Sequence, residues 1–202
     1  MKYISHEDGI LAFSETNKPV LKSHEVLVKV AAIGVNRADC MQRQGKYPAP
    51  KDDSQILGLE CAGIVCDIGG KVDKIWLNKR VFALCAGGAY SEYVAVDAKQ
   101  LMELPDDVSM REGAAIREVY LTAFGALFEL GKLQAGQTAL IHAGASGVGG
   151  AGGVSGGSGS GGTSGADGTS GQSGNIGTSG AYVTLTAGNG LTGGGVLNQN
   201  RT

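Results

Sequence analysis

The sequence predicts a mainly β fold with some helix over its first 143 residues, followed by a Gly/Ser/Thr-rich tail. Short runs with apolar residues at alternate positions are separated by glycine turns, which is typical of small barrels and sandwiches. A capping pattern at Ser109 then introduces a long apolar stretch of helix-forming residues. Of the 35 glycines, 13 fall in residues 1–143 and 22 in residues 144–202. The chain therefore joins two different compositions.

The β prediction rests on four runs, which are residues 25–33, 60–68, 80–85 and 90–96. In the first of them, EVLVKVAAI, valines recur at every second position, as in a half-buried strand. Gly69-Gly70 closes the second run, and Gly87-Gly88 separates the last two. Residues 36–54 are polar and turn-rich, so we expect no regular element there.

Helices are expected from Ser109 to about Leu130. Ser109-Met-Arg-Glu112 is a capping box, in which the serine and glutamate side chains each satisfy a backbone donor of the first helical turn. Residues 138–143, TALIHA, then predict a short buried strand, which leads into the glycine loop Gly144-Ala-Ser-Gly-Val-Gly149. Each interior glycine costs a helix about 1 kcal/mol relative to alanine, so we expect no helix after this loop.

The tail has a glycine at every third position from Gly144 to Gly180. Only glycine fits at the axis of a collagen triple helix, so this period is the collagen-type signature. The triplets contain no proline, and a Gly/Ser-rich segment is also typical of a flexible linker. Two interpretations therefore remain open, a linker and a trimeric rod. Residues 181–187 alternate like a strand.

Charge and hydropathy exclude several classes of protein. The formal net charge is −2, which gives no electrostatic reason to expect nucleic acid or an anionic membrane. No apolar run approaches the roughly 20 residues that span a bilayer. The N-terminus, MKYISHEDGI, has acidic residues where a signal peptide has its apolar core. We therefore expect a soluble cytoplasmic protein.

The four cysteines show no metal-ligand spacing, because no CxxC occurs and no histidine lies near the Cys61/Cys66 pair. We expect all four, Cys40 and Cys85 included, to be small buried hydrophobic residues. A disulfide or a metal site is the less favoured alternative.

Residues 1–149 resemble the zinc-free, NADPH-dependent quinone oxidoreductases of the medium-chain dehydrogenase/reductase superfamily, in particular the p53-inducible type. The stretches that carry this resemblance are VLVKVAAIGVNRADCMQRQGKYP, ILGLECAGIV, REVYLTAFGALFELGKLQAG and ALIHAGASGVG. The resemblance implies a GroES-like β-barrel, then the first strand of an incomplete Rossmann domain. Zinc-dependent relatives have a histidine in a G-H-E motif. Here the motif is Gly58-Leu59-Glu60, and we expect no metal.

The resemblance also implies a site for hydride transfer from NADPH to a quinone or another small electrophilic substrate. Its catalytic residues would be Asn36, Asp39 and Tyr47. Its cofactor-binding residues would be Tyr47, Thr122, Gly144, Ala145, Ser146, Gly147 and Val148. In the family this site lies in the cleft between barrel and Rossmann domain.

The same side chains also have structural interpretations. Asn36 and Asp39 are residue types that cap the turn after a strand. Tyr47 is close enough in sequence to pack on Pro48 and Pro50, and Thr122 fits an ordinary helix position.

We expect four segments: a barrel domain at 1–108, a helical connection with the truncated Rossmann start at 109–149, a Gly-x-y linker at 150–180, and a short fibre-like β segment at 181–202. The last segment is similar to bacteriophage tail-fibre repeats. Because the family continues through a complete Rossmann domain, we expect this chain to be inactive. The alternatives are a trimeric fibre protein or a chimeric reading frame without catalytic function. The family implies a dimer, and the tail offers a route to a trimer.

Overall fold

A computed structural model describes residues 1–137, 139–155 and 193–194 of the chain. The fold divides into two compact units, of which the first runs from Met1 to Glu118 and the second begins at Val119. Within the described residues, no helix combines the length and the apolar character needed to cross a bilayer.

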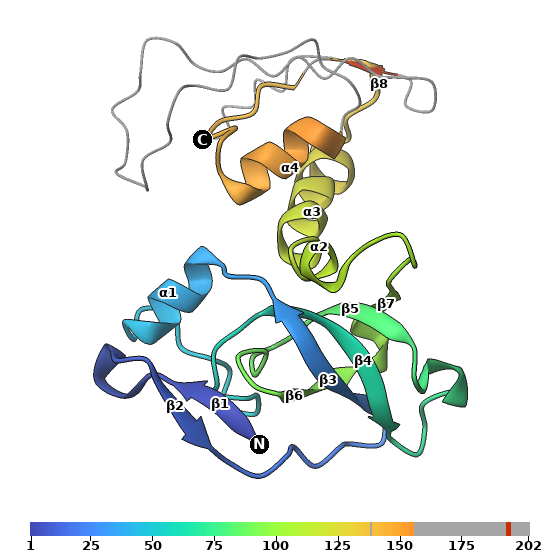
Figure 1. Cartoon of the computed structure of the whole chain (residues 1–202). Coiled ribbons are helices and arrows are strands. Elements are labelled where there is room, and N and C mark those ends of the chain that lie inside the picture. Colours follow the sequence, from blue (N-terminus) through green and yellow to red (C-terminus); the bar gives the residue numbers. More distant parts are fainter. Residues whose placement is uncertain (138, 156–192, 195–202) are drawn as a thin grey trace. The chain divides into compact units, whose positions relative to one another are not determined.

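The first unit is built on an antiparallel sheet with strand order β6-β3-β4-β5-β7 (Figure 1). Its strands are β3 (Glu25–Ile33), β4 (Glu60–Ile68), β5 (Arg80–Leu84), β6 (Tyr93–Asp97) and β7 (Leu101–Glu103). A separate hairpin consists of β1 (Lys2–Ser5) and β2 (Ala12–Glu15). Three single 3-10 turns join these strands: η1 (Glu7–Gly9), η2 (Lys74–Trp76) and η3 (Ala98–Gln100).

The strands predicted at 25–33 and 60–68 are confirmed at both ends, and β5 confirms all but the last residue of the run 80–85. The run 90–96 was predicted too early, because β6 begins only at Tyr93. The residues before Tyr93 contact the hairpin instead, since the Tyr90 carbonyl accepts a hydrogen bond from the Ile4 N–H at 2.9 Å. The hairpin itself escaped prediction. Its residue Phe13 is 85% exposed, so no buried alternation marks the strand.

Both faces of this sheet carry buried residues. Successive residues of a strand point to opposite faces, so Cys61 and Ala83 face one core while Ala62 and Phe82 face another. β-branched residues dominate the first core, which contains Val26, Val28, Cys61, Val65, Val81, Ala83, Cys85, Ala89, Val94, Val96 and Leu101. The second core is completed by Leu104 and by Ala114 of α2 (Met110–Ala114).

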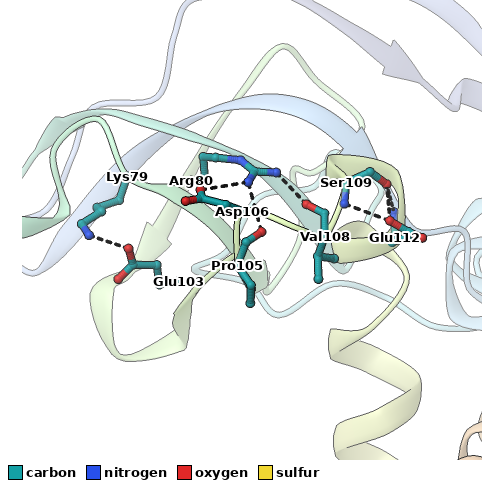
Figure 2. A network of polar contacts seen from close by, with 8 residues as sticks. All are labelled: Lys79, Arg80, Glu103, Pro105, Asp106, Val108, Ser109 and Glu112. Carbon is teal, nitrogen blue, oxygen red and sulfur yellow. Dashed lines mark hydrogen bonds and ion pairs between the residues drawn. The ribbon is translucent and has the colours of Figure 1, made fainter.

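A polar network fixes the connection between β7 and α2 (Figure 2). The Arg80 guanidinium donates to the carbonyls of Pro105 at 3.0 Å and Val108 at 2.6 Å. The predicted capping box is confirmed, since the Glu112 N–H donates to Ser109 Oγ at 3.2 Å and the Ser109 N–H donates to Glu112 Oε2 at 2.9 Å. These bonds satisfy backbone groups that the chain exposes where it leaves the sheet.

The absence of a regular element over residues 36–54 was predicted incorrectly, because α1 (Arg37–Arg43) lies there. The helix begins directly after β3, where Asp39 Oδ2 accepts a hydrogen bond from the Asn36 N–H at 2.8 Å. This side-chain acceptor at the third helical position satisfies a backbone donor that the strand leaves open. Only two of its residues, Asp39 and Gln42, are buried, so the apolar periodicity used for prediction is missing.

The second unit confirms the helices predicted up to Leu130, which are α3 (Arg117–Phe124) and the π-helical turn η4 (Gly125–Leu130). A two-residue strand, β8 (Ala135–Gly136), pairs in parallel with β9 (Gly193–Gly194). The strand predicted at 138–143 is wrong for residues 139–143, where no strand is formed. The chain turns instead, with Ala143 in the left-handed region at φ 54°. Burial is confirmed only for Ala139, which packs with Leu127, whereas Leu140 is 40% exposed.

The expectation that no helix follows the glycine loop is also wrong. α4 (Gly147–Ser155) begins inside the loop despite five glycines in its sequence GVGGAGGVS. Ser146 caps it, since Ser146 Oγ accepts from the Gly149 N–H at 3.1 Å. A Cβ at Gly149 would lie 2.1 Å from the Ala143 carbonyl oxygen, so a glycine lets the helix pack closely on the preceding turn. Capping and close packing outweigh the low helix propensity.

The cysteine prediction is half right. Cys61 and Cys85 are buried, with sulfur atoms 3.8 Å apart as free thiols, whereas Cys40 and Cys66 are exposed. Among the described residues no cluster of His, Cys, Asp or Glu has the arrangement of a metal site. The collagen-like and linker interpretations for 156–180 and the strand at 181–187 lie outside the described residues.

Candidate functional site

The first cluster of candidate residues lies where β3 ends and α1 begins. Asn36 precedes the helix in extended conformation, and Asp39 lies in the first helical turn. Asp39 is 3% exposed and accepts from the Asn36 backbone N–H at 2.8 Å. The structural interpretation of Asp39 as a cap is therefore confirmed. Asn36 belongs to the same capping box, which pairs the Asn36 side chain with the Asp39 backbone and the Asp39 side chain with the Asn36 backbone.

The Asn36 side chain is held by Glu60, the first residue of β4. The Asn36 amide Nδ2 donates to Glu60 Oε1 at 2.8 Å, and the backbone N–H of Glu118 donates to Glu60 Oε2 at 2.8 Å. Glu60 is 2% exposed, and a Cβ at Gly34 would lie 2.0 Å from its Oε1. A glycine at position 34 thus leaves the space in which this carboxylate meets Asn36.

A buried tyrosine completes the cluster. The Tyr90 hydroxyl donates to Asp39 Oδ2 at 3.2 Å, and burial together with the Asp39 carboxylate raises the pKa of Tyr90. The other carboxylate oxygen, Asp39 Oδ1, is buried and accepts no hydrogen bond within the described chain. Burial and the nearby carboxylates of Glu60 and Asp39 also raise the pKa of Glu118. The carboxyl groups of Asp39, Glu60 and Glu118 therefore lie close together, and the first two of these residues are buried.

Tyr47 is not brought into this cluster. It follows α1, is 49% exposed, and makes no hydrogen bond or ring contact in the part of the chain that the structure describes. The cluster thus unites two of the three predicted catalytic residues.

The predicted cofactor-binding residues lie in the second unit. The Ser146 N–H donates to the Ala143 carbonyl at 2.8 Å, which closes the turn formed by Gly144 and Ala145. Gly147 and Val148 then form the start of α4. The first N–H groups of a helix have no intrahelical acceptor and carry a partial positive charge, so this loop can bind an anion such as a phosphate.

Thr122 lies on α3, the helix that supports this loop. A Cβ at Gly147 would lie 2.9 Å from Val119 Cγ1, so α3 packs closely against the loop. Val119 and Thr122 are three residues apart and share one helix face. The loop and Thr122 are thereby linked through Val119 within one unit.

A large cavity in the first unit lies elsewhere. It has a volume of about 890 Å³ and is bounded by the hairpin, η1 and the C-terminal end of α1, with Tyr3, His6, Gln42, Arg43 and Gln55 among its lining residues. No predicted site residue lines it. The size of this cavity therefore does not make it the functional site. The hydrogen-bonded cluster around Asn36 is the better candidate site.

Sequence reasoning missed Glu60, Tyr90 and Glu118. The signal for Glu60 was present, because a glutamate stands directly after Gly58-Leu59 and before the apolar run 61–66. The Gly58-Leu59-Glu60 motif had predicted only the absence of a zinc-ligating histidine. Tyr90 and Glu118 carry no comparable pattern, since their roles depend on contacts 51 and 58 residues away along the chain.

Comparisons with known proteins show which families the chain is similar to. Residues 22–106 match the family model described as the alcohol dehydrogenase GroES-like domain. The chain is 35% identical over 137 residues to a quinone oxidoreductase of Mus musculus, covering 67% of this chain and 41% of that protein. It is 37% identical over 132 residues to the synaptic vesicle membrane protein VAT-1 homolog of Danio rerio, covering 65% and 27%.

Solved structures give the same picture. The human synaptic vesicle membrane protein VAT-1 homolog-like protein is similar with a TM-score of 0.69 and 30% identity, over 76% of this chain and 51% of that chain. The Escherichia coli quinone oxidoreductase complexed with NADPH is similar with a TM-score of 0.64 and 31% identity, over 74% and 47%. The chain therefore spans about half the length of these structures, and less than half of the two curated relatives.

Proposed function

The N-terminal segment of the chain belongs to the quinone oxidoreductases of the medium-chain dehydrogenase/reductase superfamily, with a GroES-like domain at residues 22–106, and from this premise we propose its role. The first unit supplies the substrate side of an NADPH-dependent reduction, with a quinone or another small electrophile as substrate. Asn36, Asp39 and Tyr47 serve this side. The loop 144–148 and Thr122 serve the cofactor side.

The observation that carries the proposal is the Asn36 amide held by a buried carboxylate. A side chain that is already fixed in position loses little entropy when it binds a ligand. Asp39 fixes the backbone at the same residue through the 2.8 Å hydrogen bond. Asn36 is thus held at its backbone by Asp39 and at its side chain by Glu60. The hydrogen bond to Glu60 is not needed for capping the helix.

The cofactor side fits a dinucleotide phosphate only in part. The start of α4 offers N–H donors at Gly147 and Val148, and the close approach of Gly149 to Ala143 keeps the turn tight. When bound, NADPH supplies the hydride.

We propose further that these 202 residues alone do not reduce quinones. The relatives are longer proteins, of which the chain covers 27% and 41%.

A titration with NADP⁺ tests the cofactor side. In the ¹⁵N-labelled chain we expect the backbone amide signals of Gly147 and Val148 to shift with NADP⁺, because the phosphates accept hydrogen bonds there. Adenosine, which lacks phosphates, serves as the control ligand and is expected to leave these signals in place. If NADP⁺ moves no signal in residues 144–148, this part of the proposal is wrong.

A further inference from the structure

We propose that Cys61 and Cys85 form a site of reversible oxidation, at which hydrogen peroxide converts the two thiols to a disulfide. The disulfide joins β4 to the residue after β5 and moves the start of β4, where Glu60 lies. Neither a quinone nor NADPH takes part in this reaction, so it lies outside the function proposed above.

The two sulfur atoms lie side by side. Cys61 Sγ and Cys85 Sγ are 3.8 Å apart, and one thiol donates a hydrogen bond to the other. Both residues belong to the same buried core, where Cys61 is 1% and Cys85 is 5% exposed. Since a disulfide bond measures about 2.05 Å, the sulfur atoms have to approach each other by about 1.8 Å.

The backbone holds both cysteines on one face of the sheet. Cys61 pairs with Ala83 between β4 and β5, and Cys85 follows Ala83 by two residues. Residues two apart along a strand point to the same side. The Cys85 N–H donates to the Leu59 carbonyl at 2.6 Å, which continues the pairing past the end of β5 at Leu84. The two thiols therefore face each other in the folded chain.

The chemistry balances with hydrogen peroxide as the only oxidant. The sulfur of Cys85, the more exposed of the two residues, attacks one peroxide oxygen. An S–O bond forms, the O–O bond breaks, and the released hydroxide leaves with the thiol proton as water. The Cys61 sulfur then attacks the sulfenic acid, so that the S–S bond forms, the S–O bond breaks and a second water leaves. Two thiols and one peroxide thus give one disulfide and two waters.

The pair is protected from rapid reaction. Hydrogen bonding to Cys61 and burial raise the pKa of Cys85, and the thiolate is the reactive form of a cysteine. We therefore expect this oxidation to be slower than that of the exposed thiols of Cys40 and Cys66. Hydrogen peroxide suits a buried site because it is little larger than water, whereas glutathione disulfide is too bulky to reach these sulfur atoms.

The double variant Cys40→Ser/Cys66→Ser keeps only the buried pair and tests the site directly. The folded variant is treated with hydrogen peroxide until its mass no longer changes, then unfolded and alkylated with N-ethylmaleimide. We expect two alkyl groups per chain before the treatment and none after it, with both restored by dithiothreitol. Trypsin cleaves after Lys71, between the two cysteines, so the peptides that contain Cys61 and Cys85 stay joined only through the disulfide.

The matched control adds Cys85→Ala to the same variant, which leaves Cys61 without a partner. We expect the control to keep its one alkylatable thiol through the treatment. The oxidation site is overturned if the double variant keeps both thiols, or loses them to sulfinic acids or to disulfides between chains. Should serine at position 40 or 66 prevent folding, iodoacetamide blocks these two exposed thiols in the unaltered chain before the oxidation.

The effect on Glu60 is read from a hydrogen-bond partner of its carboxylate. Glu60 precedes Cys61 in β4, and its Oε2 accepts from the Glu118 backbone N–H at 2.8 Å. We expect the backbone amide signal of Glu118 in the ¹⁵N-¹H spectrum to shift on oxidation and to return on reduction. The amide of Phe13, in the separate hairpin, is the reference and stays in place.

The two readouts are independent of each other and of the proposed function. A disulfide that forms without moving the Glu118 signal contradicts the effect on Glu60 and supports the oxidation site. Neither result depends on whether the chain binds NADP⁺ or reduces a quinone.

Discussion

At the scale of residues, the site depends on buried polar side chains that the sequence reveals only in part. The family resemblance predicted Asn36 and Asp39 as site residues, and their residue types predicted only that they cap the turn after the strand. Glu60 was missed, since its role depends on contacts with Asn36 and with the Glu118 N–H, which lie 24 and 58 residues away in sequence. Sequence patterns reveal local caps such as Asp39, whereas a carboxylate that joins three segments becomes visible only in the folded chain.

The Ser109/Glu112 capping box gives a pH-dependent prediction. Hydrogen bonds from the Ser109 side chain and backbone lower the pKa of Glu112 below its ordinary value. The stabilisation is therefore present above the unfolded pKa, about 4.3 for a glutamate, and is lost as pH falls through the folded pKa. We expect Glu112→Gln to lower the thermal midpoint at pH 7.

The same comparison at acid pH provides the check. The difference in thermal midpoint between Glu112→Gln and the unaltered chain should shrink as pH falls below the ordinary glutamate value, because both side chains are then neutral. Glu129→Gln controls for loss of a surface charge. A difference that stays constant from pH 7 to acid pH would contradict the assigned ionisation.

At the scale of elements, strands with an alternating apolar pattern were predicted well and elements without one were not. β3 and β4 were found at their full lengths because their valines and alanines alternate between two buried faces. α1 was missed because it buries only Asp39 and Gln42. α4 was judged implausible from its glycines, yet the Ser146 cap and the contact of Gly149 with Ala143 stabilise it. Tertiary contacts outweigh intrinsic propensity in both helices.

Two adjacent glycines of α4 give a matched test of this explanation. A Cβ at Gly150 would lie 3.4 Å from the Gly144 carbonyl oxygen, an ordinary contact, so Gly150→Ala should stabilise the helix by about 1 kcal/mol. A Cβ at Gly149 would lie 2.1 Å from the Ala143 oxygen, so Gly149→Ala should destabilise it. Amide hydrogen exchange within α4 measures both effects.

Opposite changes in exchange are expected, with slower exchange in Gly150→Ala and faster exchange in Gly149→Ala. Equal effects of the two substitutions would show that helix propensity, and not the packing of the loop on Ala143, determines the stability of α4.

At the scale of the whole molecule, the chain forms two compact units. The GroES-like class was predictable, because its strands and the motifs around Asn36 and Glu60 are continuous in the sequence. The change of composition near residue 143 was equally visible. The interpretation of the tail stays a prediction, since its glycine repeat runs mostly through residues outside the described part of the chain.

We propose that the chain carries the substrate-side cluster and the phosphate loop of an oxidoreductase and that it does not reduce quinones by itself. The most direct measurement follows NADPH consumption at 340 nm with purified chain and duroquinone, a quinone whose methyl groups block addition of the exposed thiols of Cys40 and Cys66. We predict a rate equal to that of the protein-free control. A rate that rises in proportion to the concentration of the chain would contradict the account.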